Sequence, residues 1–169
     1  MRHLGLTIAA TALAAGLAGC GKSTSSNQAE ASSGEQSAAA AQAPEPTEEQ
    51  KKALVATLPA PYNTGDLANG EAKYAVCKSC HTLNQGGPDM TGPNLHGIFG
   101  RKVAEKSGYH FSDALKGQTF TWDAAELDRW VADPKAMVPG TKMTFVGLKD
   151  AKDRTDVIAY LKAETSPAS

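Results

Sequence analysis

The pattern of apolar and polar residues divides the chain of 169 residues into an N-terminal part without amphipathic periodicity and a C-terminal part with several amphipathic segments. Residues 4–18 are rich in Leu, Ala and Gly, whereas residues 21–46 contain almost no large apolar residue. Short apolar stripes begin near residue 47 and recur towards the C-terminus. We therefore expect one small domain, preceded by a segment that cannot build a core.

Two helices are predicted to frame that domain, over residues 66–80 and 150–163. Gly70 and Tyr74 lie one turn apart on the same face of the first helix. A glycine inside a helix costs about 1 kcal/mol relative to alanine, so it usually has a packing reason. The last helix offers a matching surface through apolar residues at i, i+3 and i+4, namely Val157, Tyr160 and Leu161. We expect the two helices to approach closely at Gly70.

A third helix is predicted over residues 123–132, where Asp123 can cap the N-terminus and Pro134 ends the pattern. Its apolar face consists of Leu127, Trp130 and Val131. Residues 82–120 are instead rich in glycine and turn residues and have few periodic runs. A structureless stretch of this length is unusual in a compact domain. It is expected where a cofactor supplies the surface on which loops pack.

A short helix is also predicted over residues 47–58. Thr47 and Gln50 match a capping box, and Pro59 stops the helix. Its narrow apolar stripe consists of Leu54, Val55 and Leu58. Two interpretations stay open, a helix that docks on the domain and a partly helical piece of linker.

The candidate chemistry is concentrated in residues 77–81, which read CKSCH. A CxxCH pentapeptide is the attachment signal of c-type haem, because two thiols on one turn can add to the haem vinyl groups while the next histidine offers a ring nitrogen to the iron. The alternatives are a redox-active CxxC pair, which needs a βαβ setting, and half of a zinc site, which needs further Cys or paired His. The sequence contains neither. We expect one haem c, attached through Cys77 and Cys80, with His81 as an axial ligand.

The other axial ligand is left open by this pattern. Histidine and methionine can both ligate haem iron, although a lone methionine more often packs in a core. Met143 follows a stiff Pro-Gly loop, residues 138–142, that can present a side chain to the open face of the iron. The candidates are His96, His110, Met90, Met137 and Met143.

The segment from residue 77 to about residue 164 resembles class I cytochromes c through the strings CKSCHT, TGPNLHGIFGRK, FTW, PGTKM and DVIAYLK. The resemblance implies an all-α class I cytochrome c fold, with three to five helices wrapped around one covalently attached haem c and with the N- and C-terminal helices packed together. It also implies that Cys77 and Cys80 carry the thioethers and that His81 and Met143 ligate the iron. Such a Met/His pairing raises the reduction potential.

The same resemblance implies roles for residues around the haem. Pro93 would orient the His81 ring through its carbonyl oxygen. The haem propionates would be held by Arg101, Trp122 and Thr141. His96 becomes a structural loop residue and His110 a surface residue.

Three positions depart from the mitochondrial pattern of this family. Phe111 and Trp130 stand where tyrosines are usual, and Leu115 stands where an asparagine is usual. Because each change removes or relocates a hydroxyl or an amide near the haem, we expect a less polar crevice with a smaller water network.

The resemblance implies a monohaem electron carrier and not an enzyme. The carrier would cycle between Fe(II) and Fe(III), taking electrons from a cytochrome bc complex or a dehydrogenase and passing them to a terminal oxidase or other periplasmic reductase. The alternatives are a haem enzyme or gas sensor with a labile sixth ligand, and an electron-entry subunit of a larger complex. We expect a monomer.

The charge balance gives no indication of a nucleic-acid partner. The chain has a formal net charge of -1, and residues 61–169 contain 13 Lys and Arg against 13 Asp and Glu. The family's ring of docking lysines is matched by Lys78, Lys135 and Lys142. Because the domain as a whole is neutral, we expect modest electrostatic steering and a shallow salt dependence.

Residues 1–20 are predicted to be a lipoprotein signal peptide. Their apolar run is too short for a comfortable membrane span, and it ends in LAGC, which resembles the lipobox of bacterial lipoproteins. A lipidated Cys20 would anchor the protein to a membrane of the bacterial periplasm. The alternative is an ordinary cleaved leader in which Cys20 is incidental. Residues 21–60 are predicted to be a disordered tether, and residues 61–169 the haem domain.

Overall fold

A computed structural model describes residues 46–167, which all belong to one compact unit. The expected signal peptide, the lipidation site Cys20 and most of the expected tether lie outside the described residues. The helices are α1 (Glu48–Ala56), α2 (Leu67–Tyr74), α3 (Asp113–Lys116), α4 (Ala124–Ala132), α5 (Pro134–Met137) and α6 (Ala151–Thr165), with a 3-10 turn, η1 (Tyr62–Thr64), after α1.

The all-α class is confirmed, since the described residues form six α-helices and no strand. This number exceeds the three to five helices expected because α3 and α5 are single turns of four residues. Each begins at a side-chain cap, Ser112 for α3 and Asp133 for α5. Four residues are too few to carry a helical period, so the pattern of apolar residues did not reveal them.

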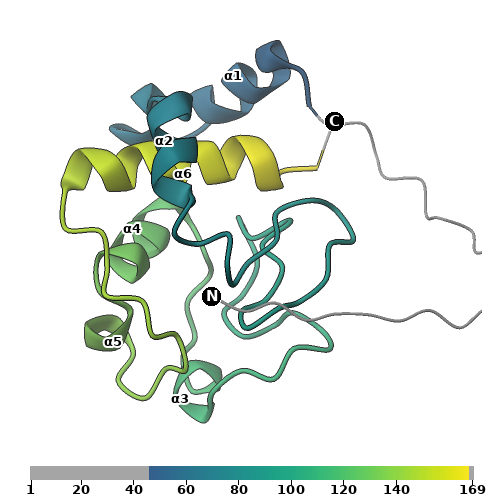
Figure 1. Ribbon diagram of the computed structural model, residues 1–169, viewed down its shortest axis with the longest axis vertical. Helices are drawn as coiled ribbons and strands as arrows, with labels where there is room; N and C mark the ends of the chain where they lie inside the picture. Colours follow the sequence, from purple (N-terminus) through teal and green to yellow (C-terminus); the bar gives the residue numbers. More distant parts are fainter. Residues whose placement is uncertain (1–45, 168–169) are drawn as a thin grey trace, which may run out of the picture. The chain divides into compact units, whose positions relative to one another are not determined.

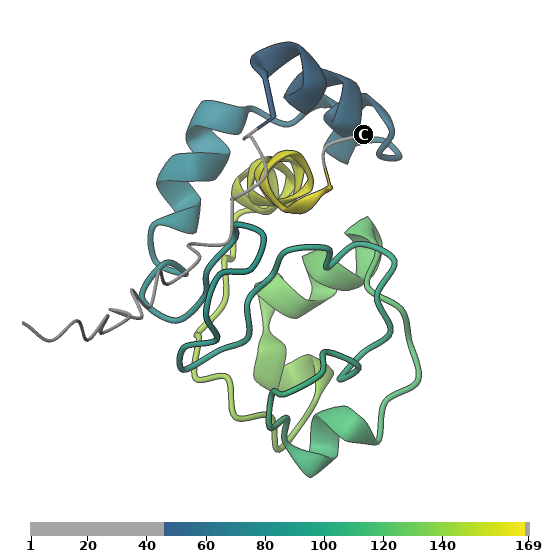
Figure 2. The same ribbon diagram turned by 90° about the vertical axis from the view of Figure 1, so that its right-hand side faces the viewer.

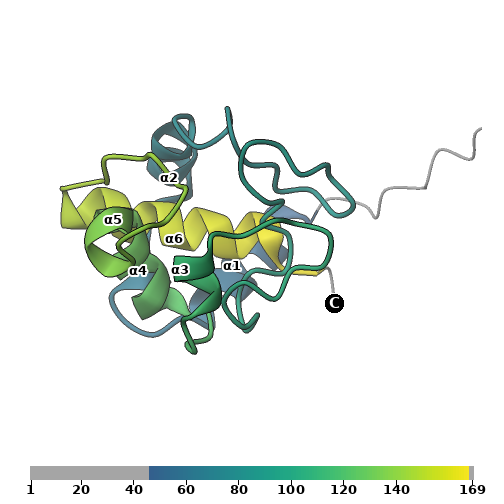
Figure 3. The same ribbon diagram turned by 90° about the horizontal axis from the view of Figure 1, so that it is seen from below.

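The C-terminal helix α6 is the centre of the packing. Figure 2 shows α1 and α2 on one side of it, with α4 and the long loops on the other, and the view from below places α3, α4 and α5 together on that second side (Figure 3). Val157, Ile158 and Ala159 of α6 are completely buried. Within residues 46–167 no helix combines the length and apolar composition needed to cross a bilayer.

Helix α2 crosses α6 steeply (Figure 1), and the close approach expected at Gly70 is confirmed. A Cβ atom added at Gly70 would overlap the carbonyl oxygen of Asp156 and would lie 2.7 Å from the Cβ of Tyr160. No side chain larger than hydrogen fits between the two backbones at this point. The glycine therefore offsets its weak helix propensity by allowing the crossing.

Asp156 connects the start of α2 to α6 inside this crossing. Its buried carboxylate accepts hydrogen bonds from the backbone N–H of Asp66 at 2.9 Å and from the Asn69 side chain at 2.7 Å, and it pairs with Lys152. Burial acts to raise the pKa of Asp156, but these donors outweigh it and hold that pKa below its ordinary value of 3.8.

We expect Asp156→Asn to lower the free energy of unfolding at pH 7 by about 2 kcal/mol, because one donor then faces an amide N–H₂ group instead of a carboxylate oxygen. Because the pKa of Asp156 is lower in the folded protein than in the unfolded chain, the carboxylate stabilises the fold at pH values above its unfolded pKa. That stabilisation is lost as the pH falls through the folded pKa. The difference in the free energy of unfolding between wild type and variant should therefore become smaller below about pH 4. Denaturant titrations at pH 7 and at about pH 3 check this, and an equal difference at both pH values would contradict it.

Helix α1 docks on α6, which is the first of the two interpretations left open for residues 47–58. Its capping box is present, with the Thr47 N–H donating to Gln50 at 2.8 Å. Val55 packs against Ala159 and Ala163 of α6, and a salt bridge of 2.8 Å joins Lys51 to Glu164. All three of these apolar residues, Val55 of α1 and Ala159 and Ala163 of α6, are buried.

The segment after α1 also enters the main core. Leu58 is buried in the same apolar cluster as Ile98, Trp122 and Leu127. The packed region thus begins upstream of residue 61, where we expected the domain to start, because both α1 and Leu58 cover apolar surface of the helices and loops that follow.

Candidate functional site

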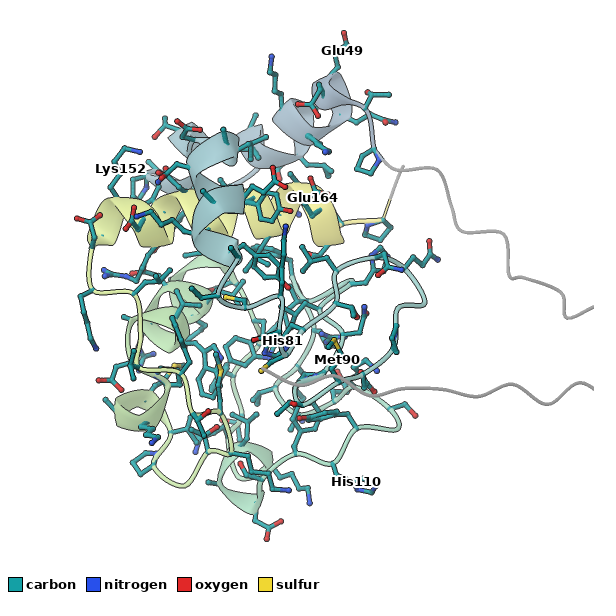
Figure 4. All side chains as sticks on the ribbon, viewed as in Figure 1. Glu49, His81, Met90, His110, Lys152 and Glu164 are labelled. Atoms are coloured by element: carbon teal, nitrogen blue, oxygen red, sulfur yellow. The ribbon has the colours of Figure 1, made fainter. Side chains whose placement is uncertain are left out.

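A cavity of about 400 Å³ lies between α6, α4 and the long loops. It brings together every residue for which a haem contact was expected: Cys77, Cys80, His81, Pro93, Arg101, Trp122, Thr141 and Met143. The remaining ligand candidates differ in position. His110 is at the exposed edge of the cavity, whereas His96, Met90 and Met137 do not line it. Figure 4 shows His81 in the middle of the loops and His110 at the periphery.

The CxxCH segment reaches the cavity by a change of backbone geometry. Helix α2 ends at Tyr74 and does not continue to residue 80 as predicted. The next residues form tighter turns, with the Cys77 N–H bonded to the Tyr74 carbonyl at 2.8 Å and the Cys80 N–H bonded to the Cys77 carbonyl at 3.0 Å. These bonds span three residues instead of four, as in a 3-10 helix. The turns place both cysteines and His81 along the cavity wall.

The backbone and ring of His81 are held by three neighbouring groups. Its Nδ1 lies 2.7 Å from the carbonyl oxygen of Pro93, so this nitrogen is the donor and Nε2 is left as the ligating atom. The Tyr74 hydroxyl donates to the His81 carbonyl at 3.1 Å. A Cβ added at Gly92 would lie 2.6 Å from Nε2 and 2.7 Å from Nδ1, so the ring rests directly on the backbone there.

The protonation state of His81 also suits a metal ligand. Burial lowers the pKa of the imidazole, and the bond to Pro93 opposes that shift only in part. The ring is therefore neutral at pH 7, the form in which histidine binds metals.

Cys77 and Cys80 line the same cavity, and neither forms a disulfide within the described part of the chain. Burial, and secondarily the nearby Cys80, raises the pKa of the Cys77 thiol to about 11. Among residues 46–167 no group of three or more His, Cys, Asp or Glu side chains is placed to hold a metal ion. The surroundings therefore do not fit a zinc site, whereas two thiols beside a neutral histidine fit the attachment of a haem.

Several apolar residues line the same cavity as Met143. Leu115, Leu127 and Val131 line it, together with Trp130, whose ring lies edge-on to Trp122 with centroids 5.5 Å apart. The loop before Met143 is anchored by the completely buried Val138. It is closed by a bond of 3.2 Å from the Met143 N–H to the Thr141 hydroxyl.

Arg101 supplies the positive charge expected for an anionic group of the cofactor. Its side chain lines the cavity and donates to the carbonyl of His96 at 3.3 Å. Burial lowers its pKa, and within the described part of the chain it forms no salt bridge, although the carboxylate of Asp89 is near enough to act on it. A partly buried cation of this kind fits a carboxylate such as a haem propionate.

Sequence reasoning missed two contacts that close the loops below the cavity. The Tyr109 hydroxyl donates to the Thr91 carbonyl at 2.6 Å, and Lys106 forms a salt bridge of 2.8 Å with Asp89. Tyr109 and Lys106 also line the cavity. These residues lie in loops without periodicity, and nothing in the sequence pairs them across 17 or 18 positions.

Comparisons with known proteins agree with this geometry. A family model described as Cytochrome c matches residues 67–164. Cytochrome c of Kluyveromyces lactis is 43% identical over 105 residues, which are 62% of this chain and 96% of that protein. Cytochrome c2 of Rhodomicrobium vannielii is 44% identical over 61% of this chain and 82% of its own length. The solved structure of cytochrome cH from Methylobacterium extorquens is 52% identical, with a TM-score of 0.53 over 58% of this chain and 98% of the other.

Proposed function

Because the chain belongs to the cytochrome c family and binds one covalently attached haem c, we propose that it is a monohaem electron carrier with His81 and Met143 as the axial ligands. The homologues of this chain are electron-carrying cytochromes c and c2. The observation that supports His/Met ligation is that His81 and Met143 line the same cavity, together with apolar residues such as Leu115, Leu127 and Val131.

Haem supplies the one-electron Fe(III)/Fe(II) couple, and the residues of the chain hold its surroundings constant. Pro93 keeps the donor role on Nδ1 of His81, and Thr141 and Val138 hold the loop that carries Met143. A carrier needs such rigid ligands because both redox states then share one geometry, and little reorganisation accompanies the transfer.

The apolar residues that line the cavity together with Met143 favour a carrier over the haem enzyme or gas sensor. Leu115, Leu127 and Val131 have no group that can move a proton to a bound peroxide. Trp130 likewise replaces a tyrosine without adding an acid or base. We therefore do not expect a substrate at the iron.

The partners and location follow from the expectations drawn from the sequence. We propose that the protein accepts electrons from a cytochrome bc complex or a dehydrogenase and delivers them to a terminal oxidase or other periplasmic reductase. A lipidated Cys20 would hold it at a membrane of the bacterial periplasm, and the segment that follows Cys20 would let the haem domain reach both partners.

The carrier function and its ligands are tested together by adding CO to the ferrous holoprotein. We expect no spectral change in the wild type, because Met143 holds the sixth position, and prompt formation of the CO complex in Met143→Ala. Thr144→Ala, in the exposed neighbouring residue, is the matched control and should remain unreactive. Rapid CO binding by the wild type would overturn the proposal and favour a ligand-binding haem protein.

A further inference from the structure

The peptide group between Pro93 and Asn94 is hydrogen-bonded at both of its ends. Its carbonyl oxygen accepts the bond of 2.7 Å from Nδ1 of His81, and its N–H donates to the Asp89 carboxylate at 2.7 Å. This peptide bond is trans, so the N–H and the carbonyl point in opposite directions within one plane. The carboxylate of Asp89 and the ring of His81 are therefore joined through a single peptide group.

The side chain of Asn94 fixes the orientation of that peptide group. Asn94 is 5% exposed, and its amide donates to the Thr82 hydroxyl at 2.7 Å and to the Asn84 carbonyl at 3.0 Å. Its side-chain oxygen accepts the backbone N–H of His96 at 3.1 Å. Because Asn94 is held from three sides, a substitution that changes only the charge of Asp89 should leave the peptide group in place.

Asp89 is an anion whose negative charge is partly balanced by Lys106. The Lys106 Nζ atom lies 2.8 Å from each of the two carboxylate oxygens. The bond from Lys106 lowers the pKa of Asp89 most, burial opposes this shift, and the bond from Asn94 adds to the lowering. The peptide N–H therefore donates to an ionised group at pH 7. Hydrogen bonds to ionised groups are roughly twice as strong as those between neutral groups.

We propose that Asp89 is a positioning residue for the axial histidine: its carboxylate polarises the Pro93–Asn94 peptide group, which strengthens the bond from His81 and lowers the reduction potential, while Lys106 moderates this effect. Hydrogen bonds joined in series strengthen one another. A stronger acceptor at Nδ1 makes a metal-bound histidine more basic, and a more basic ligand favours Fe(III) over Fe(II). The proposal rests on the carrier function with His81 as a ligand, and it adds a group that sets the potential.

A direct effect of the Asp89 charge on the iron is the competing explanation. The side chains of Asp89 and Lys106 retain 27% and 22% exposure, so that solvent and salt screen their field at longer range. Their opposite charges also largely cancel at a distance. Polarisation through the peptide group acts instead at hydrogen-bond contact, where screening is small.

The test uses Asp89→Asn and Lys106→Gln in the full-chain holoprotein. Asp89→Asn removes the charge but keeps a side-chain oxygen that can accept the Asn94 N–H. The matched controls are Asp113→Asn and Lys116→Gln, which remove the same charges from an exposed salt bridge of 3.1 Å on α3. Neither residue of that pair lines the cavity.

We expect Asp89→Asn to raise the reduction potential, with a shift of the reduction equilibrium of about threefold towards Fe(II), or about 28 mV at 59 mV per tenfold. Lys106→Gln should shift it about twofold towards Fe(III), because the unpaired carboxylate polarises the peptide group more strongly. Both controls should stay within about 1.3-fold of the wild type. Mere loosening of the loop would move both variants in the same direction, so shifts of equal sign overturn the proposal.

Proton NMR of the His81 Nδ1–H in the ferrous holoprotein separates polarisation through the peptide group from a direct charge effect. This resonance should move upfield in Asp89→Asn and downfield in Lys106→Gln, because it follows the strength of the bond to Pro93. Altered potentials with an unmoved resonance overturn the proposal in favour of the direct effect.

Failure of this proposal is distinguishable from failure of the carrier function. Reversible cycling between Fe(III) and Fe(II) with equal potentials in the wild type and all four variants overturns only the role of Asp89. A wild type that does not cycle reversibly overturns the carrier function, and the role of Asp89 with it.

Discussion

We expect Gly92→Ala to reduce the yield of correctly ligated holoprotein at least tenfold. The new Cβ would overlap the His81 ring, which is already fixed by its bond of 2.7 Å to Pro93 and cannot move away without breaking it. Loss of a group that orients a metal-bound histidine typically costs 10- to 100-fold in metal affinity or activity. Here the ring itself is displaced, so the effect should reach the upper part of that range.

The measurement is the absorption spectrum of ferric and ferrous protein relative to total polypeptide. Thr91→Ala is the matched control, because this exposed neighbour contributes only its backbone carbonyl to the bond from Tyr109. The control should give wild-type spectra. A Gly92→Ala protein with wild-type yield and unaltered low-spin spectra would show that the loop yields easily and that the ring is not held by this contact.

We expect Gly70→Ala to lower the free energy of unfolding by about 2 kcal/mol. Overpacking typically costs 1–3 kcal/mol, and the upper end applies because the added Cβ meets the backbone of Asp156, with its carbonyl carbon at 2.8 Å. Alanine returns about 1 kcal/mol through its better helix propensity. Packing therefore outweighs propensity, and the sign of the change is opposite to that in an exposed helix.

Guanidinium titration of the holoprotein, followed by far-UV circular dichroism, measures this change. Gly117→Ala is the matched control, since its Cβ would meet no atom closer than 3.5 Å and its backbone is helical. That variant should be neutral or slightly more stable. Equal stability of the Gly70 and Gly117 variants would mean that α2 can shift away from α6 at little cost.

The main helices could be predicted from the sequence wherever the apolar periodicity was long enough to detect or a capping residue marked the start. The helix predicted over residues 123–132 corresponds to α4, with Asp123 capping Glu126 at 2.8 Å. The glycine at position 70 indicated the α2–α6 crossing because only a close neighbour explains its place in a helix. Docking of α1 could not be decided, since its partner surface consists of the small residues Ala159 and Ala163, which give no apolar stripe.

The residues of the candidate site likewise fall into those that the sequence could predict and those that it could not. Cys77, Cys80 and His81 follow from the chemistry of the motif. The resemblance added five further lining residues, namely Pro93, Arg101, Trp122, Thr141 and Met143. The supporting contacts needed coordinates. Gly92 supports the His81 ring across a loop, and Tyr109 bonds to Thr91 between two segments that have no periodicity. Loop contacts of this kind depend on tertiary placement, which apolar patterns do not record.

The docked position of α1 has a mechanical consequence. Tension applied to the chain upstream of Glu48 acts first on α1, whose hold on α6 consists of Val55 in a small apolar contact and the salt bridge from Lys51 to Glu164. Both lie at the α1–α6 contact, whereas no residue of α1 lines the cavity. Under tension α1 should detach from α6 first. The positions of His81 and Met143 should change only after that detachment.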